Sequence, residues 1–130
     1  WCLGRDPYPE TIRYLGSSEH VGKITECIVS NHLVRLLFSY FPSTQFDYVN
    51  LLFYWQSKKK RELDFVIRQE GRYVPIEVKY HSKINSEDAF SIIDFQKGGK
   101  SSKGLLLTRN SLQTQRSYIQ VPVPIFLLLI

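Results

Sequence analysis

Asp64, Glu77 and Lys79 are the residues whose types and spacing in this sequence point to chemistry. Two carboxylates held close together repel each other, so one pKa rises or a cation must lie between them. Mg²⁺ is such a cation, because it prefers carboxylate oxygens and keeps several of its waters, and Mn²⁺ is an alternative. A neighbouring lysine adds a positive charge near a metal-bound water or a scissile phosphate. Together these groups supply what phosphodiester hydrolysis requires: a polarised phosphoryl group, an activated water and charge compensation.

A predicted hairpin would bring the two acids together. Glu70-Gly71 forms a turn between two strand-like segments. With the turn centred between these two residues, Asp64 lies opposite Glu77, and Glu62 lies opposite Lys79. Directly opposite residues on one face of a sheet have Cβ atoms about 4.5–5.5 Å apart. The carboxylates of Asp64 and Glu77 are therefore expected to converge.

Alternation along each strand assigns the faces. Glu77 and Lys79 share one face of their strand, and Asp64 and Val66 share one face of the preceding strand. The residues expected on the opposite faces are Leu63, Phe65, Ile67, Ile76, Val78 and Tyr80. An acid followed by Glu-x-Lys is a loose pattern that also suits a solvated, salt-bridged sheet face. The apolar flanks favour acids in the middle of core strands, which supports the site.

A further acid, Glu26, comes from a predicted helix. Ser17 and Ser18 are suitable caps for a helix that runs to about Tyr40, and Pro42 ends it. Its apolar stripe consists of Val29, Leu33, Leu36 and Leu37. Glu26 lies one turn before this stripe on the same side, and a carboxylate that faces the core needs a partner.

The remaining elements complete a mixed α/β domain. Further strands are predicted at residues 51–55, 61–69, 72–80, 104–108 and 117–121, with a second helix at 86–97. In that helix Phe90 and Ile93 are expected to face the core, with Ile92 as a further candidate. The order αβββαβ, with the short strand at 117–121 after it, describes one domain over residues 18–130, with a mixed central sheet flanked by helices. Residues 1–17 are expected to form an irregular lead-in.

Composition limits the classes of function. The 130 residues carry a net charge of +5 and are 43% hydrophobic, which is enough for a core and suits a polyanionic partner. Cys2 and Cys27 lie far apart, which predicts free thiols in a reducing compartment, the cytoplasm. The longest apolar run, residues 125–130, is too short to cross a bilayer, so no membrane partner is expected. The start at Trp1 and the apolar C-terminus predict a part of a longer protein.

A basic turn between the first two predicted strands consists of Lys58, Lys59, Lys60 and Arg61. Such a run is most often a solvated turn, but beside a phosphodiester site it could hold nucleic-acid phosphates. Tyr54 and Trp55 alternate across the strand before it, so one is expected in the core and the other exposed. The segment Gly98-Gly99-Lys100-Ser101 lacks the first glycine of a Walker A motif, so no ATP hydrolysis is expected here.

The segment Glu62-Leu63-Asp64-Phe65-Val66, followed by Pro75-Ile76-Glu77-Val78-Lys79, resembles the motif of the PD-(D/E)xK nuclease superfamily. The helix around Gly22 and Glu26 is similar to that superfamily's first core helix. More closely, the chain from about Ser18 to its end resembles the C-terminal DUF4143-type domain of prokaryotic AAA-type ATPases. That family has a Gly-x-x-x-Glu helix, a Tyr-Trp strand, a Glu-x-Asp-Phe-Val strand and a Pro-Ile-Glu-Val-Lys strand in this order. Residues 103–126 are similar to its closing strands.

The resemblance implies a restriction-endonuclease-like core and Mg²⁺-dependent cleavage of nucleic acid, DNA rather than RNA, with an ATPase domain upstream in the same protein. It implies Asp64 and Glu77 as metal ligands together with the Val78 carbonyl. It also implies Lys79 as the residue that orients or activates water, and Glu26 as a supporting or second-metal acid. One rival is a domain that no longer cuts and that docks DNA or regulates the attached ATPase. A second rival is a plain interaction domain in which Asp64 and Glu77 point apart.

Overall fold

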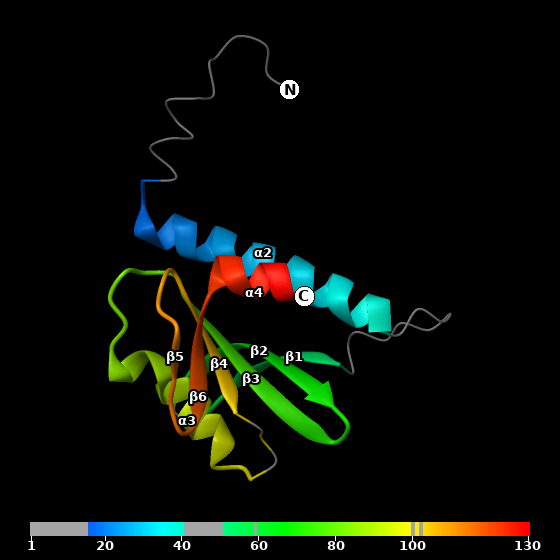
Figure 1. Ribbon diagram of the computed structural model, residues 1–130. Coiled ribbons are helices and arrows are strands. Elements are labelled where there is room, and N and C mark those ends of the chain that lie inside the picture. Colours follow the sequence, from blue (N-terminus) through cyan, green and yellow to red (C-terminus); the bar gives the residue numbers. More distant parts are fainter. Residues whose placement is uncertain (1–15, 41–50, 59, 100, 102) are drawn as a thin grey trace.

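The chain forms a mixed sheet between helices (Figure 1). The computed structural model describes residues 16–40, 51–58, 60–99, 101 and 103–130. The strands are β1 (Leu52–Gln56), β2 (Glu62–Gln69), β3 (Arg72–Lys79), β4 (Gly104–Thr108), β5 (Gln113–Thr114) and β6 (Tyr118–Pro122). The helices are α2 (Ser18–Tyr40), the short 3₁₀ helix η2 (Ser86–Ala89), α3 (Phe90–Gln96) and α4 (Val123–Leu129). The predicted α/β class with a mixed central sheet is confirmed.

One half of the sheet is an antiparallel meander of β1, β2 and β3, as predicted. The paired residues of β2 and β3 run from Gln69 opposite Arg72 to Phe65 opposite Ile76. This register is the one set by a turn centred within Glu70-Gly71, whose φ angles are 49° and 79°. Positive φ at both central residues belongs to the two-residue turn whose twist matches that of antiparallel strands. The predicted turn centre is therefore confirmed.

The other half of the sheet is parallel, in the order β3-β4-β6, with the short strand β5 at the edge. η2 and α3 connect β3 to β4 and pack against the sheet. The approach of α3 to β4 is so close that a Cβ on Gly104 would lie 2.3 Å from Cγ2 of Ile92. Position 104 therefore requires glycine for packing rather than for a special backbone angle.

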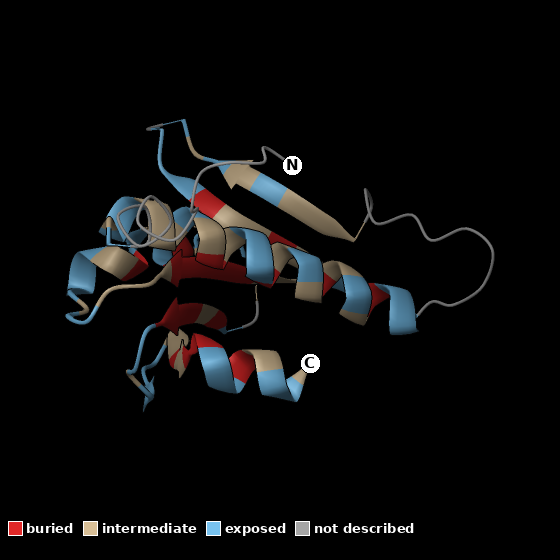
Figure 2. Ribbon diagram, turned by 90° about the horizontal axis from the view of Figure 1, so that it is seen from above, coloured by how far each residue is buried: buried red, intermediate tan, exposed pale blue. Residues whose placement is uncertain are grey.

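The two faces of the sheet have separate apolar clusters. α2 and α4 lie on one face and α3 on the other (Figure 1). The cluster on the α2 and α4 face contains Val29, Leu33, Ile76, Val78, Leu107, Val123 and Phe126. The cluster on the α3 face contains Leu63, Val66, Ala89, Ile92 and Leu106. In Figure 2 exposed residues follow the outer side of α2, whereas buried residues mark the strands beneath it.

The segment predicted as one helix over residues 86–97 is divided into η2 and α3. Ile92 is fully buried, whereas 40% of Phe90 and 36% of Ile93 are exposed. The expectation that Phe90 and Ile93 face the core is therefore wrong. The α-helix begins only at Phe90, and the side chains that pack on the sheet are spaced three apart at Ala89, Ile92 and Phe95.

The closing segment is the helix α4, which lies within and beyond the region compared with the family's closing strands and was not predicted. Pro122 is its N-cap residue and Pro124 lies in its first turn, where a missing amide hydrogen removes no helical bond. Val123 and Phe126 are buried three residues apart, which is a helical spacing. The apolar run at the end of the chain thus buries only one side of its helix, and Leu128 lies on the exposed side.

Candidate metal site and its surroundings

A bulge in β2 begins next to Asp64. Phe53 of β1 lies opposite Val66, but Trp55 lies opposite Leu63. The single residue between them in β1 therefore faces two residues of β2, which is a β-bulge. Bulges twist a strand and redirect its side chains, and they are common beside functional sites.

The bulge exchanges the two faces of β2. Leu63 and Val66 pack in the same apolar cluster, while Phe65 and Ile67 pack against the other. The predicted alternation, which grouped Leu63 with Phe65 and Ile67 and placed Asp64 with Val66, is wrong at this point. The physical reason is the extra residue, because a one-residue insertion moves every later side chain to the other face.

Asp64 lies where the regular pairing of β2 and β3 ends. The last paired residues are Phe65 and Ile76. Beyond them, the amide of Val78, two residues after Ile76, donates a hydrogen bond of 2.7 Å to Oδ2 of Asp64. A side-chain oxygen thus replaces the main-chain carbonyl that would continue the ladder. The N–H and C=O groups of one strand residue point to the same neighbouring strand, so the Val78 carbonyl points toward the side of Asp64.

Glu77 is buried on β3, with 4% of its surface exposed. Its Oε1 lies 2.6 Å from Nζ of Lys79, which fits the prediction that these two side chains share a face. Its Oε2 is buried and has no hydrogen-bond partner among the described residues. Burial and then the charge of Asp64 raise the pKa of Glu77 to about 7, although Lys79 opposes the rise. A carboxylate in this position is stabilised only by a proton or a further cation.

Lys79 is held among several acids. Burial by itself would lower the pKa of the Lys79 ammonium, but the hydrogen bond and charge of Glu77 outweigh it. The charges of Asp64 and Asp88 act in the same direction, so the pKa of Lys79 is raised. Lys79 is therefore protonated at neutral pH and offers a charge and N–H donors.

Glu26 approaches the same region from α2. Burial and then the charge of Asp64 raise the pKa of Glu26, while Lys79 and Lys23 lower it. For Asp64 itself, burial raises the pKa first, and the Val78 amide and Lys79 oppose that rise. The predicted site residues Glu26, Asp64, Glu77 and Lys79 thus form one electrostatic group, drawn from a helix and two strands.

Tyr54 is a neighbour of the site that the sequence did not identify. It is the β1 residue that faces the bulge, and 59% of it is exposed. A hydrogen bond to Glu62 is the main cause that raises the pKa of Tyr54 to about 12, and the charge of Asp64 adds to it. The phenol is therefore neutral and can donate a hydrogen bond at the edge of the site. No sequence pattern marks the bulge, so only the exposure of one member of the Tyr-Trp pair was predictable.

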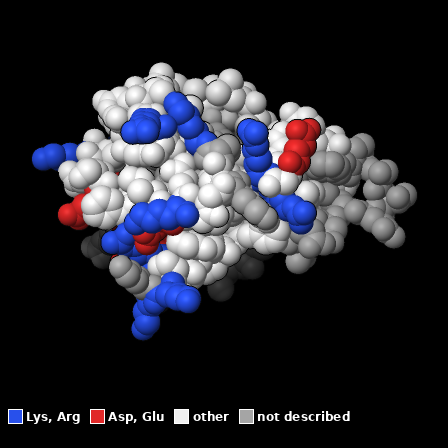
Figure 3. All heavy atoms as spheres, turned by 90° about the horizontal axis from the view of Figure 1, so that it is seen from below, with Lys and Arg blue, Asp and Glu red and all other residues white. Residues whose placement is uncertain are grey.

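The basic turn lies between β1 and β2, beside the first residue of β2. Lys58 and Lys60 are exposed, and Lys59 lies outside the described residues. Arg61 is engaged within the domain: its Nη1 lies 3.3 Å from Oδ2 of Asp94, and its guanidinium lies 5.3 Å from the ring centre of Phe90. Figure 3, which views the molecule from the α3 side, has more Lys and Arg than Asp and Glu on its surface.

The candidate donor set for a metal consists of the carboxylates of Asp64 and Glu77 and the carbonyl of Val78. These are hard oxygen donors of the kind that Mg²⁺ prefers. The unpartnered Oε2 of Glu77 fits a cation, since its lone pairs are buried and unused within the described structure. In the described ranges, no group of three or more His, Cys, Asp or Glu side chains is arranged to hold a metal ion.

Fold and site together define a mixed α/β domain with a buried glutamate, a half-buried aspartate and a lysine where two antiparallel strands separate. Residues 21–128 match the family described as a domain of unknown function, DUF4143. The chain belongs to this family, which confirms that part of the resemblance. Neither a curated protein nor a solved structure matches the chain. Among the helices of the described ranges, none has both the length and the apolar character needed to cross a membrane.

Proposed function

We propose that this domain binds Mg²⁺ between Asp64 and Glu77 and hydrolyses nucleic-acid phosphodiester bonds, with DNA as the first candidate substrate. The observation that supports this most directly is the carboxylate of Glu77. It is buried, one of its oxygens has no partner among the described residues, and burial together with the charge of Asp64 raises its pKa to about 7. Two carboxylates beside one protonated lysine keep a net negative charge, which is costly in a core without a further cation.

The residues at the Asp64–Glu77 pair would have different roles in hydrolysis. A bound Mg²⁺ would supply a polarised phosphoryl oxygen and a more acidic water. Asp64, Glu77 and the Val78 carbonyl would hold it. Lys79 is protonated because its pKa is raised, so it would orient the water and compensate the charge of the phosphate rather than remove a proton. In the cleavage step water attacks phosphorus and the bond from phosphorus to the leaving oxygen breaks. Solvent takes a proton from the attacking water and gives one to the leaving oxygen.

The wider context is also part of the proposal. We place this domain in the PD-(D/E)xK superfamily, with a restriction-endonuclease-like core, on the strength of its motif and of its strand pair. An ATPase domain upstream in the same protein, a cytoplasmic location and phosphate contacts by the exposed Lys58 and Lys60 follow from the same resemblance and from the basic composition.

One observation favours a second function, a DNA-docking or regulatory module that does not cut. Nζ of Lys79 already lies 2.6 Å from Oε1 of Glu77. The lysine therefore neutralises part of the buried charge without a metal. In such a module the basic surface would bind phosphates, and the acids would serve only as structural ion pairs.

A nicking assay separates the two functions. Supercoiled plasmid is incubated with the protein and Mg²⁺ or Mn²⁺, and Asp64→Asn and Glu77→Gln serve as matched variants that keep the side-chain shape. We expect nicking by the unaltered protein and none by either variant. DNA binding that weakens steeply with salt, without nicking, would support the docking module. Nicking that persists in both variants would rule out this site.

A further inference from the structure

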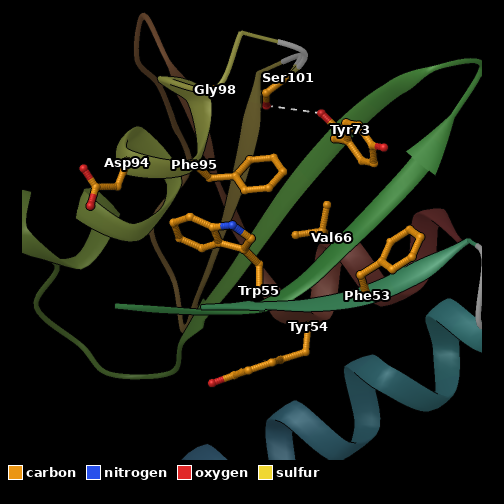
Figure 4. Close-up of a pocket in the computed structure, with 9 residues that line it drawn as sticks. All are labelled: Phe53, Tyr54, Trp55, Val66, Tyr73, Asp94, Phe95, Gly98 and Ser101. Atoms are coloured by element: carbon orange, nitrogen blue, oxygen red, sulfur yellow. Dashed lines mark hydrogen bonds between the residues drawn. The ribbon is translucent and has the colours of Figure 1, made fainter. Parts of the chain in front are cut away.

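An aromatic hollow lies between the antiparallel strands and α3 (Figure 4). Its volume is about 530 Å³, within the range of about 300–1,000 Å³ that small-ligand pockets occupy. It is lined by Phe53, Tyr54, Trp55, Val66, Tyr73, Asp94, Phe95, Gly98 and Ser101. The ring of Tyr54 points away from the hollow, to the other side of β1, so the aromatic lining comes from the other four rings.

The four rings contact one another edge to face. Trp55 and Phe95 have ring centres 5.3 Å apart and planes at 85°. Tyr73 and Phe95 follow at 6.2 Å and 82°, and Phe53 and Tyr73 at 6.5 Å and 65°. All four are only half-buried. In an edge-to-face pair the edge of one ring covers only one face of the other, so a ring face remains on which a flat aromatic ligand can stack.

The rim of the hollow has the charge that suits a phosphate. A second hollow of about 460 Å³ shares Trp55 and Asp94 with the first and is also lined by Lys58. The carboxylate of Asp94 is matched by Arg61 at 3.3 Å and Lys97 at 2.7 Å. The acid at the rim therefore does not leave a net negative charge that would repel a phosphate.

The aromatic hollow also lies close to the candidate metal site. Trp55 is opposite Leu63, the residue next to Asp64, and neighbouring strands are only about 4.8 Å apart. Because Tyr54, a neighbour of that site, points to the opposite side of the edge strand β1 from the hollow, a nucleic-acid strand with one phosphate at the metal site would pass round β1 to place a base in the hollow.

We propose that the aromatic hollow binds one unstacked nucleobase of a single-stranded nucleic acid, while Lys58 contacts the adjoining phosphate. This inference deepens the proposed nuclease function and rests on it for the identity of the ligand. The base stacks on Trp55 and Phe95, and the sugar-phosphate backbone runs along the basic turn. Because stacking is available to every base, the hollow favours single strands over duplex without selecting a sequence.

Trp55 itself reports on the hollow. In a Trp1→Phe protein Trp55 is the single tryptophan, and EDTA in the buffer prevents metal-dependent cutting. An oligothymidine of about 12 nucleotides, within the usual range of site sizes, is titrated against a strand of equal length without bases. We expect the oligothymidine to quench Trp55 emission and to bind at least about 5-fold more tightly than the abasic strand, because one stacked base is worth roughly 5- to 150-fold. Equal affinity of both strands without a change in Trp55 emission would overturn the proposal, since phosphates alone would then account for binding.

Variants provide a second readout. It is independent of the abasic comparison in the Trp1→Phe protein. Trp55→Ala should weaken oligothymidine binding by roughly 5- to 150-fold and Trp55→Phe by much less, because phenylalanine restores a ring. Tyr40→Ala, which removes an exposed aromatic at the end of α2, is the matched control and should bind normally. If the protein binds oligothymidine through Trp55 but does not nick plasmid, base binding in the hollow stands and the proposed hydrolysis is wrong. If the protein nicks plasmid and the Trp55→Ala protein cleaves single strands with an unchanged KM, the proposed hydrolysis stands and base binding in the hollow is wrong.

Discussion

The two ends of the β2–β3 hairpin differ in the groups that bond to the backbone and in the charge that they bury. At the turn, Glu70 and Gly71 have φ angles of 49° and 79°, and the strands beyond them pair regularly. At the open end, the Asp64 carboxylate accepts the Val78 amide hydrogen, and the pKa of Glu77 is raised to about 7. At the turn end, backbone N–H and C=O groups bond to each other. At the open end, a side-chain oxygen accepts a backbone hydrogen and charged groups are buried.

This difference indicates where the domain gives up stability. A regular end would bury apolar side chains and continue the ladder, as the turn end does. The open end instead keeps acids whose pKa values are all raised, Glu26, Asp64 and Glu77. Departures from regular pairing and apolar burial occur most often at the functional sites of a protein. We therefore expect removal of a charge at the open end to lower activity or raise stability, and substitution in the turn to lower stability.

The largest expected effect is on catalysis at the open end. Lys79→Gln removes the protonated amine beside Glu77 and should lower the plasmid-nicking rate by about 100-fold or more, the usual effect of losing a transition-state donor. Lys103→Gln, at an exposed lysine before β4, is the control and should nick normally. Lys79→Gln activity within a few-fold of the unaltered protein would remove Lys79 from the mechanism.

The next effect is on the pH dependence of stability. The pKa of Glu77 is about 7 in the folded protein and 4.5 ordinarily, so the folded state holds the proton more tightly. The stabilisation from that proton is complete below about pH 4.5 and is lost as pH rises through about 7, for a total of roughly 3 kcal/mol. Urea unfolding in EDTA measures this loss. Saturating Mg²⁺ should reverse much of it, because the ion binds the deprotonated pair.

A failure of this pH prediction has a definite form. If the free energy of unfolding in EDTA is the same for Glu77→Gln and the unaltered protein at every pH from about 4 to 8, Glu77 does not titrate in a buried position.

A smaller effect of opposite sign is expected from Asp64→Asn. The amide oxygen can still accept the Val78 hydrogen bond, while the charge that raises the pKa of Glu77 is gone. We expect the metal-free protein to become more stable by about 1 kcal/mol near pH 8. Chemical denaturation in EDTA tests this. A loss of stability instead would mean that the Asp64 charge is compensated in the folded protein without a metal.

Substitution at the turn end should have the smallest effect on the metal site. Gly71→Ala places a Cβ at a φ of 79°, which should destabilise the fold by about 1–2 kcal/mol. Mn²⁺ affinity should not change, because the turn lies at the other end of the strands. Altered Mn²⁺ affinity in a folded Gly71→Ala protein would show that the two ends are coupled.

The sequence predicted the parts of the fold that local chemistry determines. The register of β2 and β3 follows from the two-residue turn at Glu70-Gly71, and the confirmed pairs end only one step before Asp64. In the predicted inward stripe of α2, Val29, Leu33 and Leu37 are buried, whereas Leu36 is only half-buried. In contrast, α4 was missed because a short apolar run fits a buried strand as well as a helix. Its proline positions and the spacing of its buried residues, three apart, contained the missing signal.

The site was predictable only in part. The shared side of Glu77 and Lys79 followed from alternation along β3. The face of Asp64 did not, because the bulge opposite Tyr54 depends on how β1 and β2 pair, and no local pattern in β2 marks it. The hydrogen bond from Val78 to Asp64 is likewise a tertiary feature. Prediction from sequence was therefore reliable where the ladder is regular and failed where a side chain replaces it.

Calorimetric titration with Mn²⁺ near pH 8 tests the central claim, that Asp64 and Glu77 bind one divalent ion, most directly. The unaltered protein should bind one Mn²⁺, Asp64→Asn and Glu77→Gln should each lose this binding, and Gly71→Ala should retain it. Near pH 7 the heat should depend on the ionisation enthalpy of the buffer, because Glu77 releases a proton when the ion binds. Unchanged Mn²⁺ binding in both Asp64→Asn and Glu77→Gln, or no binding by the unaltered protein, would contradict the account.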